Sequence, residues 1–547
     1  MFDISNPKLP SNMLHSFANV PTMRMPRSSF KRSHTHKTTF NADYLIPIYV
    51  DEALPGDTFD LNASFLARLS TPLKTPIMDN LYLDVFFFAV PNRILQTNFP
   101  KIFGAETDPA DSNAIQAPII TPPLGGWSAL SLEDYFGLPL GIPNLQITSY
   151  WHRGYNKIWN DHFRDQNLQD SVVVDLDDGP DTTTDYVLLK RGKRHDYFTS
   201  CLPWPQKSDS KVLLPLGTEA PVLGIGTQDK IFEGSSVTAY ESDGTSSVYT
   251  FAKSVTDSAA NVSRRLYVEG TAATGGYPDI RVDLSSAASA TVNELREALT
   301  TQQVYELDAR SGTRYNEMID AHYGVRIPDS TMQRSEYLGG GSYPINITAI
   351  AQTSESSTTK QGHLTSVGSV SARTGFTKSF VEHCVIIGLA NVRSDITYQN
   401  NSIHRMFSRR DRFDWYHPIL ANLGEQSVLM QEIFAVNGAT DTDADGTPDN
   451  EEVFGYQERW AEYRYSKSLI TGQFRSDHAT PLDSWHLSED FASAPPLNAS
   501  FIVSNTQTPL ARASAVTTYP LIIFDSFFQQ NTVRPMPVYS VPGLERL

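Results

Sequence analysis

Cysteine is almost absent from the sequence, with only Cys201 and Cys384 among 547 residues. Two isolated cysteines cannot build a disulfide framework or a four-cysteine zinc site, so a reducing interior suits the chain. Long hydrophobic runs are missing too, because the most apolar short run is Val85–Val90 and no stretch approaches the roughly 20 apolar residues that span a bilayer. The N-terminus MFDISNPKLP also lacks the basic-then-apolar pattern of a signal peptide. We therefore expect a soluble protein that is not exported by a cleaved signal.

Catalytic motifs are scarce as well. The sequence has no His-Glu-x-x-His zinc motif, no Gly-x-Ser-x-Gly elbow and no phosphate-cradling glycine loop. The 13 histidines are dispersed, and the neighbouring pair His34 and His36 is too small a set for a metal site. Paired carboxylates leave no sequence signature, so a carbohydrate-active enzyme on a β-sandwich stays a minor alternative. We expect a protein that is not an enzyme.

The composition favours an acidic, loop-rich β protein. Lys and Arg number 44 against 61 Asp and Glu, which gives a net charge of −17. A chain this acidic does not coat nucleic acid with its whole surface, because phosphate binding needs Lys and Arg, although a local basic patch is compatible with it. The 34 prolines and 32 glycines are scattered along the chain, and no helical array appears. This pattern favours an all-β core with long loop excursions over stacked α/β domains.

Periodicity predicts several strands and two helices. Apolar side chains alternate from Phe59 to Leu69, which indicates a half-buried strand. The segment Leu81–Val90 is apolar on both faces except at Tyr82 and Asp84, and Phe376–Val392 is similar. Both are predicted to be central strands, so the sheet must tolerate large insertions between its strands. Aromatic residues at helical spacing from Trp151 to Phe163 predict a helix with a packing face, and a capping-box pattern opens a second helix at Thr291–Ala309.

Two basic segments are candidate nucleic-acid contacts. Residues 1–40 look like an extended arm that is rich in proline and has a single acidic residue, Asp3. Its basic residues suit either a solvated tail or an inward-facing arm that meets nucleic acid or a neighbouring subunit. The second segment interleaves arginine with aromatic residues, which suits single-stranded nucleic acid and a subunit interface equally well. The candidate contacts are Arg24, Arg27, Lys31, Arg32 and Lys37 in the arm, and Arg405, Arg409, Arg410 and Arg412 in the second segment.

Residues 215–290 differ in composition from the rest of the chain. Ser, Thr, Gly and Ala dominate there, with short alternating pieces between them. We expect an inserted surface protrusion with its own small β-structure, and a floppy loop is the alternative.

The segment Asp441–Glu452 has the spacing of a calcium-binding loop of the EF-hand type. Acidic residues stand at loop positions 1, 3, 5, 9 and 12, and Gly446 at position 6 permits the sharp turn that gathers oxygens around a hard cation. Pro448 departs from the EF-hand pattern, so we expect an isolated loop that binds Ca2+, with an acidic surface turn as the alternative. The candidate ligands are the side chains of Asp441, Asp443, Asp445, Asp449 and Glu452 and the backbone carbonyl of Thr447.

Seven blocks of the sequence resemble the major capsid protein (VP1/F-type) of microviruses, small single-stranded DNA bacteriophages, and specifically their gokushovirus branch. Together they extend over most of the chain and are far more specific than any one short motif. Residues 437–449 look like an extra loop relative to this family, so the calcium prediction rests on spacing alone. The blocks are His36–Phe59, Thr71–Asn80, Phe86–Arg93, Tyr155–Asp170, Tyr305–Val325, Gln333–Gly341 and Glu452–Tyr465.

The resemblance implies an all-β fold with helical loop insertions: an eight-stranded viral jelly-roll sandwich formed by residues 41–547, with 215–290 as its protrusion. It further implies a T=1 icosahedral shell of identical subunits around circular single-stranded DNA. The implied partners are an internal scaffolding protein, a pilot (minor capsid) protein and a host surface receptor that the protrusion would meet. The location would be the virion, assembled in the cytoplasm of a bacterial host. A calcium-binding β-sandwich adhesin or glycan-binding module is the alternative function.

Overall fold

The computed structural model describes residues 26–108, 114–207, 292–357, 359–399, 401–442 and 444–539, together with the backbone of six short strands within residues 222–282. Contacts divide the chain into two compact units. One consists of Met1–Pro205 with Ser311–Leu547, and the other of Gln206–Arg310. No helix among the described residues combines the length and hydropathy needed to cross a bilayer.

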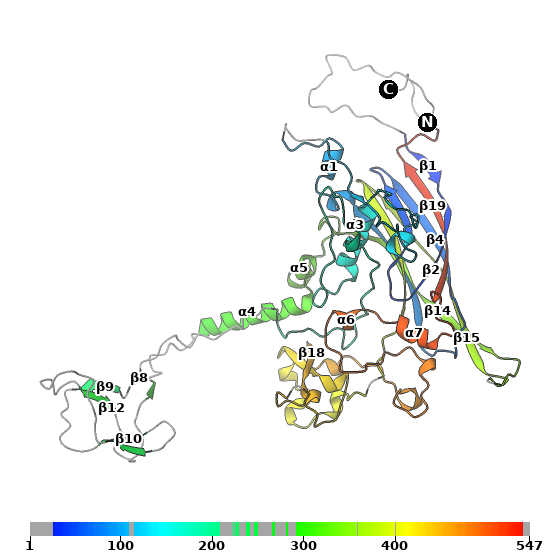
Figure 1. Cartoon of the computed structure of the whole chain (residues 1–547). Coiled ribbons are helices and arrows are strands. Elements are labelled where there is room, and N and C mark those ends of the chain that lie inside the picture. Colours follow the sequence, from blue (N-terminus) through cyan, green and yellow to red (C-terminus); the bar gives the residue numbers. More distant parts are fainter. Residues whose placement is uncertain are drawn as a thin grey trace. The chain divides into compact units, whose positions relative to one another are not determined.

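Eight antiparallel strands of the larger unit form two rows of four. One row has the order β2–β19–β4–β15 and the other the order β3–β16–β5–β14, and they join where β14 pairs with β15. This order is that of a jelly roll, and Figure 1 shows the rows as one curled sheet. The predicted all-β jelly roll is therefore confirmed. The strands are β2 His34–Phe40, β3 Ile46–Ala53, β4 Thr58–Leu69, β5 Leu81–Pro91, β14 Glu336–Ala351, β15 Leu364–Ser379, β16 Cys384–Ser394 and β19 Ile522–Arg534.

Two predicted boundaries differ from the structure. The segment predicted to be one strand, Phe376–Val392, is the end of β15 and most of β16, separated at Phe380–His383. There the backbone of Phe380 exchanges hydrogen bonds with Gly56 and Asp57, which turns the chain from one row to the other. The segment predicted to be an arm, residues 1–40, includes two strands that pair with β19, namely β1 (Ser28–Lys31) and β2. Residues 1–25 lie outside the described part of the chain.

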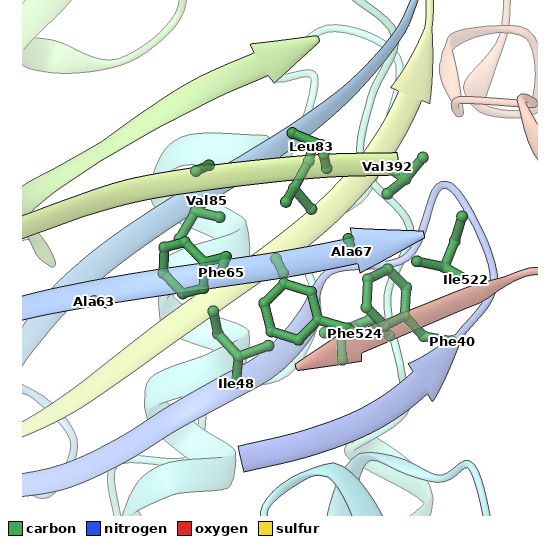
Figure 2. Close-up of a cluster of buried hydrophobic side chains, with 14 of the residues drawn as sticks. Phe40, Ile48, Ala63, Phe65, Ala67, Leu83, Val85, Val392, Ile522 and Phe524 are labelled. Carbon is green, nitrogen blue, oxygen red and sulfur yellow. The ribbon is translucent and has the colours of Figure 1, made fainter. Parts of the chain in front are cut away.

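The main core lies inside the curl of the sheet. Side chains from both rows meet there, and the rings of Phe65 on β4 and Phe524 on β19 stack with centroids 5.6 Å apart. Figure 2 shows these rings among residues of β2, β3, β5 and β16. The predicted alternation of β4 is confirmed, because its apolar face is buried while Leu66, on the other face, is exposed. Burying one large apolar side chain contributes about 1.5–3 kcal/mol.

A helical insertion covers the outer face of β5 and β16. The helix α3 (Tyr150–Ile158) continues as one π-helical turn, Trp159–Phe163, and packs its Tyr155, Ile158 and Trp159 against the two strands. The predicted aromatic packing face is thus confirmed, and it explains why β5 and β16 are apolar on both faces. The same insertion contains the 3-10 turn Asn92–Ile94, α1 Phe99–Ile102, α2 Leu132–Tyr135 and the paired strands β6 Ile119–Ile120 and β7 Ile147–Thr148.

The segment between β16 and β19 builds a second, smaller core. It is centred on the paired strands β17 (Glu425–Leu429) and β18 (Val453–Glu458), with Val428 and Phe454 packed against Phe198 and Phe501. The same segment also contains α6 Ala499–Ile502, α7 Gln507–Ala513, and 3-10 turns at Arg405–Phe407, Arg412–Asp414, Pro418–Leu420, Met430–Glu432, Asp449–Glu451, Ala461–Tyr463, Gly472–Phe474 and Asp483–Trp485.

The smaller unit contains most of helix α4 (Val292–Ser311). This helix corresponds to the predicted helix Thr291–Ala309, of which the structure describes the residues from Val292 on. Within residues 222–282 three antiparallel pairs lie where short β-segments were expected: β8 Val222–Leu223 with β13 Arg281–Val282, β9 Ile225–Gln228 with β12 Arg265–Val268, and β10 Val237–Tyr240 with β11 Ser246–Tyr249. The predicted limits, 215 and 290, lie outside the described residues. In the larger unit α5 spans Tyr315–Tyr323.

Candidate functional site

Among the basic candidates near the N-terminus, Lys31 lies on β1, Lys37 on β2 and Arg32 between these strands, while Arg27 precedes β1. Arg32 donates two hydrogen bonds to the carboxylate of Asp51, at 2.8 and 3.0 Å. Burial alone would raise the pKa of Asp51, but the hydrogen bonds from Arg32 and Gln530 outweigh it and lower that pKa. Arg32 is thus committed to an internal ion pair, while Lys31 and Lys37 are exposed. Arg24 lies outside the described residues.

Arg27 also makes internal contacts. Its guanidinium donates to the hydroxyl of Thr58 at 2.6 Å and to the carbonyl of Val533 at 3.5 Å. Both contacts are exposed, so they leave the guanidinium within reach of solvent. Of the five candidates in the predicted arm, Lys31 and Lys37 are the described residues best placed to meet an external phosphate.

The arginine cluster of the second basic segment divides into two pairs with different surroundings. Arg405 donates to the carbonyl of Ser427 at 2.6 Å and to Glu432 at 3.3 Å. Arg409 donates to Glu462 at 3.1 Å. The side chain of Arg409 is only 10% exposed and that of Glu462 only 3%. These two arginines therefore stabilise the fold.

Glu432 lies at the centre of a buried set of polar contacts beneath these arginines. Desolvation raises the pKa of its carboxyl group, and the charge of Arg405 opposes that rise. The hydroxyl of Tyr197 donates to the same carboxylate at 3.0 Å. Lys467, which lies beside them, has a pKa lowered to about 8 by desolvation. Removing Arg405 would leave the buried carboxylate of Glu432 without its ion-pair partner.

Arg410 and Arg412 are exposed instead, among exposed apolar side chains. The guanidinium of Arg412 lies 5.9 Å from the ring centre of Phe413. We call this region the arginine–aromatic surface and define it by the exposed residues Met406, Phe407, Arg410, Arg412, Phe413, Trp415, Tyr416, Ile419, Leu423 and Tyr463. All four predicted arginines thus lie in or beneath this region, but only Arg410 and Arg412 are exposed to solvent.

The candidate calcium loop connects β17 to β18. Gly446 has a φ of +92°, as the predicted turn requires, and its N–H donates to Asp441 at 3.1 Å. The backbone N–H of Thr447 donates to Asp445 at 2.7 Å. Asp449 accepts from the hydroxyl and the N–H of Thr442, and these bonds lower the pKa of Asp449.

The fit of this loop to a cation is partial. One carboxylate oxygen of Asp441 is buried with no hydrogen-bond partner among the described residues, as a cation ligand would be before binding. Both oxygens of Asp449 are engaged by Thr442. In the part of the chain that the structure describes, which leaves out Asp443, no three acidic, histidine or cysteine side chains are grouped to hold a metal. The calcium site stays a prediction.

Two features of the larger unit were not predicted. The lone acid of β5, Asp84, is buried and accepts hydrogen bonds from Arg191 and from Arg393, the latter at 2.7 Å. An acid within an otherwise apolar strand was the available signal, but its partners come from distant segments. The second feature is a pocket of about 390 Å³ beside α3, which is lined by Val50, Phe136, Leu138, Ile147, Thr148, Trp151 and His152.

The described residues form a jelly roll in which several charged side chains make internal ion pairs, and the arginine–aromatic surface is exposed. Residues 18–544 match the family described as "Capsid protein (F protein)". The capsid protein VP1 of Bdellovibrio phage phiMH2K is 43% identical to this chain, over 97% of each. The VP1 proteins of Chlamydia phage 1 and Spiroplasma virus 4 are 41% and 34% identical, over 99% and 98% of each chain respectively.

The chain therefore belongs to the F-protein family of phage capsid proteins, whose members are components of the virion. The resemblance to microvirus capsid proteins is confirmed. Membership in the gokushovirus branch stays a prediction.

Proposed function

We propose that this protein is the major shell subunit of a small phage and that its copies assemble into a closed T=1 icosahedral particle around circular single-stranded DNA. The observation that carries the proposal is the family match along almost the whole chain, at residues 18–544. The jelly roll supports it, because this fold presents a rigid body from which long loops can reach neighbouring subunits. The role is structural, since the matched relatives are capsid proteins.

Electron microscopy of the purified full-length protein tests this function directly. We expect closed particles of one small diameter that protect single-stranded DNA from nuclease when they are taken from phage-producing cells. A protein that stays monomeric and binds glycans would contradict the proposal and favour the alternative of an adhesin-like β-sandwich.

We further propose that the exposed lysines of β1 and β2 contribute to DNA contact. Lys31 and Lys37 lie on neighbouring strands along one edge of β19, which keeps them on a rigid support. Arg27 beside them is exposed as well. Because a single-stranded genome must be neutralised by a subunit that is acidic overall, such local cations are the residues available for the task.

We also propose the remaining partners of a microvirus shell: an internal scaffolding protein, a pilot protein and a host receptor. The separate compact unit Gln206–Arg310 supports a protrusion role for residues 215–290, because an independent unit can be displayed without disturbing the jelly roll. Particles of a chain that lacks residues 215–290 should assemble but adsorb poorly to host cells. Unchanged adsorption would contradict the attachment role.

Finally, we propose that the loop Asp441–Glu452 binds Ca2+. The turn at Gly446 and the unbonded oxygen of Asp441 support this. A bound cation would neutralise carboxylates that otherwise repel one another.

A further inference from the structure

The arginine–aromatic surface leaves several large apolar side chains of the single chain in water. Ile419 is 93% exposed, Phe407 75% and Phe413 63%. Met406, Trp415, Tyr416, Leu423 and Tyr463 are exposed around them. Scattered single apolar residues are ordinary on protein surfaces, but a contiguous set of this kind marks an interaction site.

Ring contacts and one hydrogen bond connect several of the residues that carry this surface. The ring of Tyr416 lies 6.2 Å from that of Tyr463 and 5.8 Å from that of the buried Trp460. The indole N–H of Trp460 points to the carbonyl of Leu420 at 3.5 Å, next to Ile419. Phe413 contacts His417 with ring centres 6.2 Å apart. Three short turns, Arg412–Asp414, Pro418–Leu420 and Ala461–Tyr463, therefore present one surface.

The turns that carry this surface are held in place by hydrogen bonds. The carboxylate of Asp414 accepts from the backbone N–H groups of Arg410 and Asp411 at 2.7 and 2.8 Å. The guanidinium of Arg409 stacks on Tyr463, 4.3 Å from its ring centre. A surface that is already ordered loses little conformational entropy when a partner binds, so its apolar area is available for affinity.

Charges on and beneath the surface are largely paired. Arg405 is bonded to Glu432 and Arg409 to Glu462. The two exposed arginines, Arg410 and Arg412, alternate with Asp411 and Asp414. Phosphate binding requires an excess of positive charge, whereas two of the four arginines are ion-paired and the segment around the other two also contains two acids.

We propose that the arginine–aromatic surface is an interface between two copies of this chain in the shell, an inference that rests on the proposed function. Each copy carries a net charge of −17, so copies repel one another least where charge is balanced and the contact is apolar. Tyr, Trp, Phe, Met and Arg are the residues enriched in protein interfaces, and this surface consists mainly of them. Ile419 and Phe407, the most exposed apolar residues of the arginine–aromatic surface, would be buried by the neighbouring copy.

The test replaces Ile419 and Phe407 separately in the full-length chain, under conditions in which the wild-type chain forms shells. Sedimentation measures the protein concentration at which shells appear. For Ile419→Glu and for Phe407→Glu we expect that concentration to rise by at least about tenfold, because a buried side chain of this size contributes more than a decade to an association constant. Thermal unfolding of the unassembled chain should stay unchanged, since both side chains point into solvent there.

Ile419→Leu is the matched control and should assemble like the wild type, because it keeps the apolar area. Wild-type assembly of Ile419→Glu and Phe407→Glu would overturn the inference. Normal assembly of these variants with reduced DNA content would overturn it too and would identify nucleic acid as the occupant of the surface. If the wild-type chain forms no shells, both the proposed function and this inference are wrong. If the wild-type chain forms shells and the variants assemble equally well, only the inference is wrong.

Discussion

At the residue scale, the chain joins distant segments through buried charged pairs. Asp84 on β5 binds Arg393 on β16 and Arg191 from the insertion after α3. Burial alone would raise the pKa of Asp84, but the hydrogen bonds from Ser342 and Arg393 and the charge of Arg191 lower it. The sequence marks Asp84 as the one acid in an apolar strand. Its partners could not be predicted, because spacing along the chain says nothing about which distant cations meet it.

The same limit applies to the candidate site. Arginines interleaved with aromatics could be recognised from the sequence, and both readings, nucleic acid and subunit interface, followed from composition. The ion pairs of Arg405 and Arg409 could not be predicted, because Glu432 and Glu462 reach them through the folding of the β17–β18 core. It is this pairing that favours a protein partner for the surface.

His152 is expected to make the stability of the subunit pH-dependent. It is buried among Trp127, Phe136 and Tyr186, with a carboxylate oxygen of Glu133 3.7 Å from its Nε2, and neither ring nitrogen makes a hydrogen bond among the described residues. Burial lowers the pKa of His152 to about 4, from an ordinary value of 6.5. Between these values the unfolded chain binds a proton that the folded chain does not. The contribution of His152 to the free energy of unfolding is therefore complete above about pH 6.5 and falls by about 3 kcal/mol toward pH 4.

Denaturant unfolding of the unassembled protein from pH 7 to pH 4 measures this effect. His152→Phe keeps a ring in the cluster and removes the titration, so its stability should depend less on pH than that of the wild type. His363→Phe, at an exposed position, is the control and should leave the wild-type profile unchanged. Equal slopes for wild type and His152→Phe would show that His152 is not the group responsible.

At the element scale, strands and helices were predicted correctly where the pattern within a single segment was enough to identify them. The alternation of Phe59–Leu69 and the aromatic spacing of Trp151–Phe163 each describe one element against one neighbour, and both elements are present. The break at Phe380–His383 was missed because these four residues include no Gly or Pro to mark a turn, while contacts with the distant Gly56 and Asp57 set the corner. Strand β2 was missed because its exposed face is polar and its pairing partner, β19, lies at the other end of the chain.

The loop Asp441–Glu452 is the element with a testable ligand. Calorimetric titration of the wild-type chain with Ca2+ should give a binding signal that Asp443→Ala abolishes, because position 3 supplies one of the six to eight oxygens that the ion needs. Asp477→Ala, an exposed acid outside the loop, is the matched control and should bind like the wild type. Equal heats for wild type and Asp443→Ala would leave the loop as an acidic surface turn.

At the scale of the whole molecule, the subunit combines a large negative charge with local cations and one charge-balanced apolar surface. The jelly-roll class and the family could be inferred from the sequence, because seven blocks carried the resemblance. The division into two compact units was only partly foreseen, since composition marked residues 215–290 but not the inclusion of helix α4. With the proposed function, this charge distribution predicts opposite dependences on salt for assembly and for DNA binding.

Copies that each carry −17 repel one another through solvent, and salt screens this repulsion over about 10 Å at 0.1 M. Raising the salt concentration should therefore lower the protein concentration at which shells form.

Binding of single-stranded DNA by the unassembled chain should weaken instead, because each phosphate contact releases counterions and contributes about −0.7 to the slope of log affinity against log salt. For Lys31→Gln with Lys37→Gln we expect that slope to become shallower by about 1.4, with assembly unchanged. Lys360→Gln, at an exposed lysine in the β14–β15 connection, controls for the loss of charge alone. A double variant with the wild-type salt slope would remove Lys31 and Lys37 from the DNA contact, whereas one that fails to assemble would assign them to the contacts between subunits.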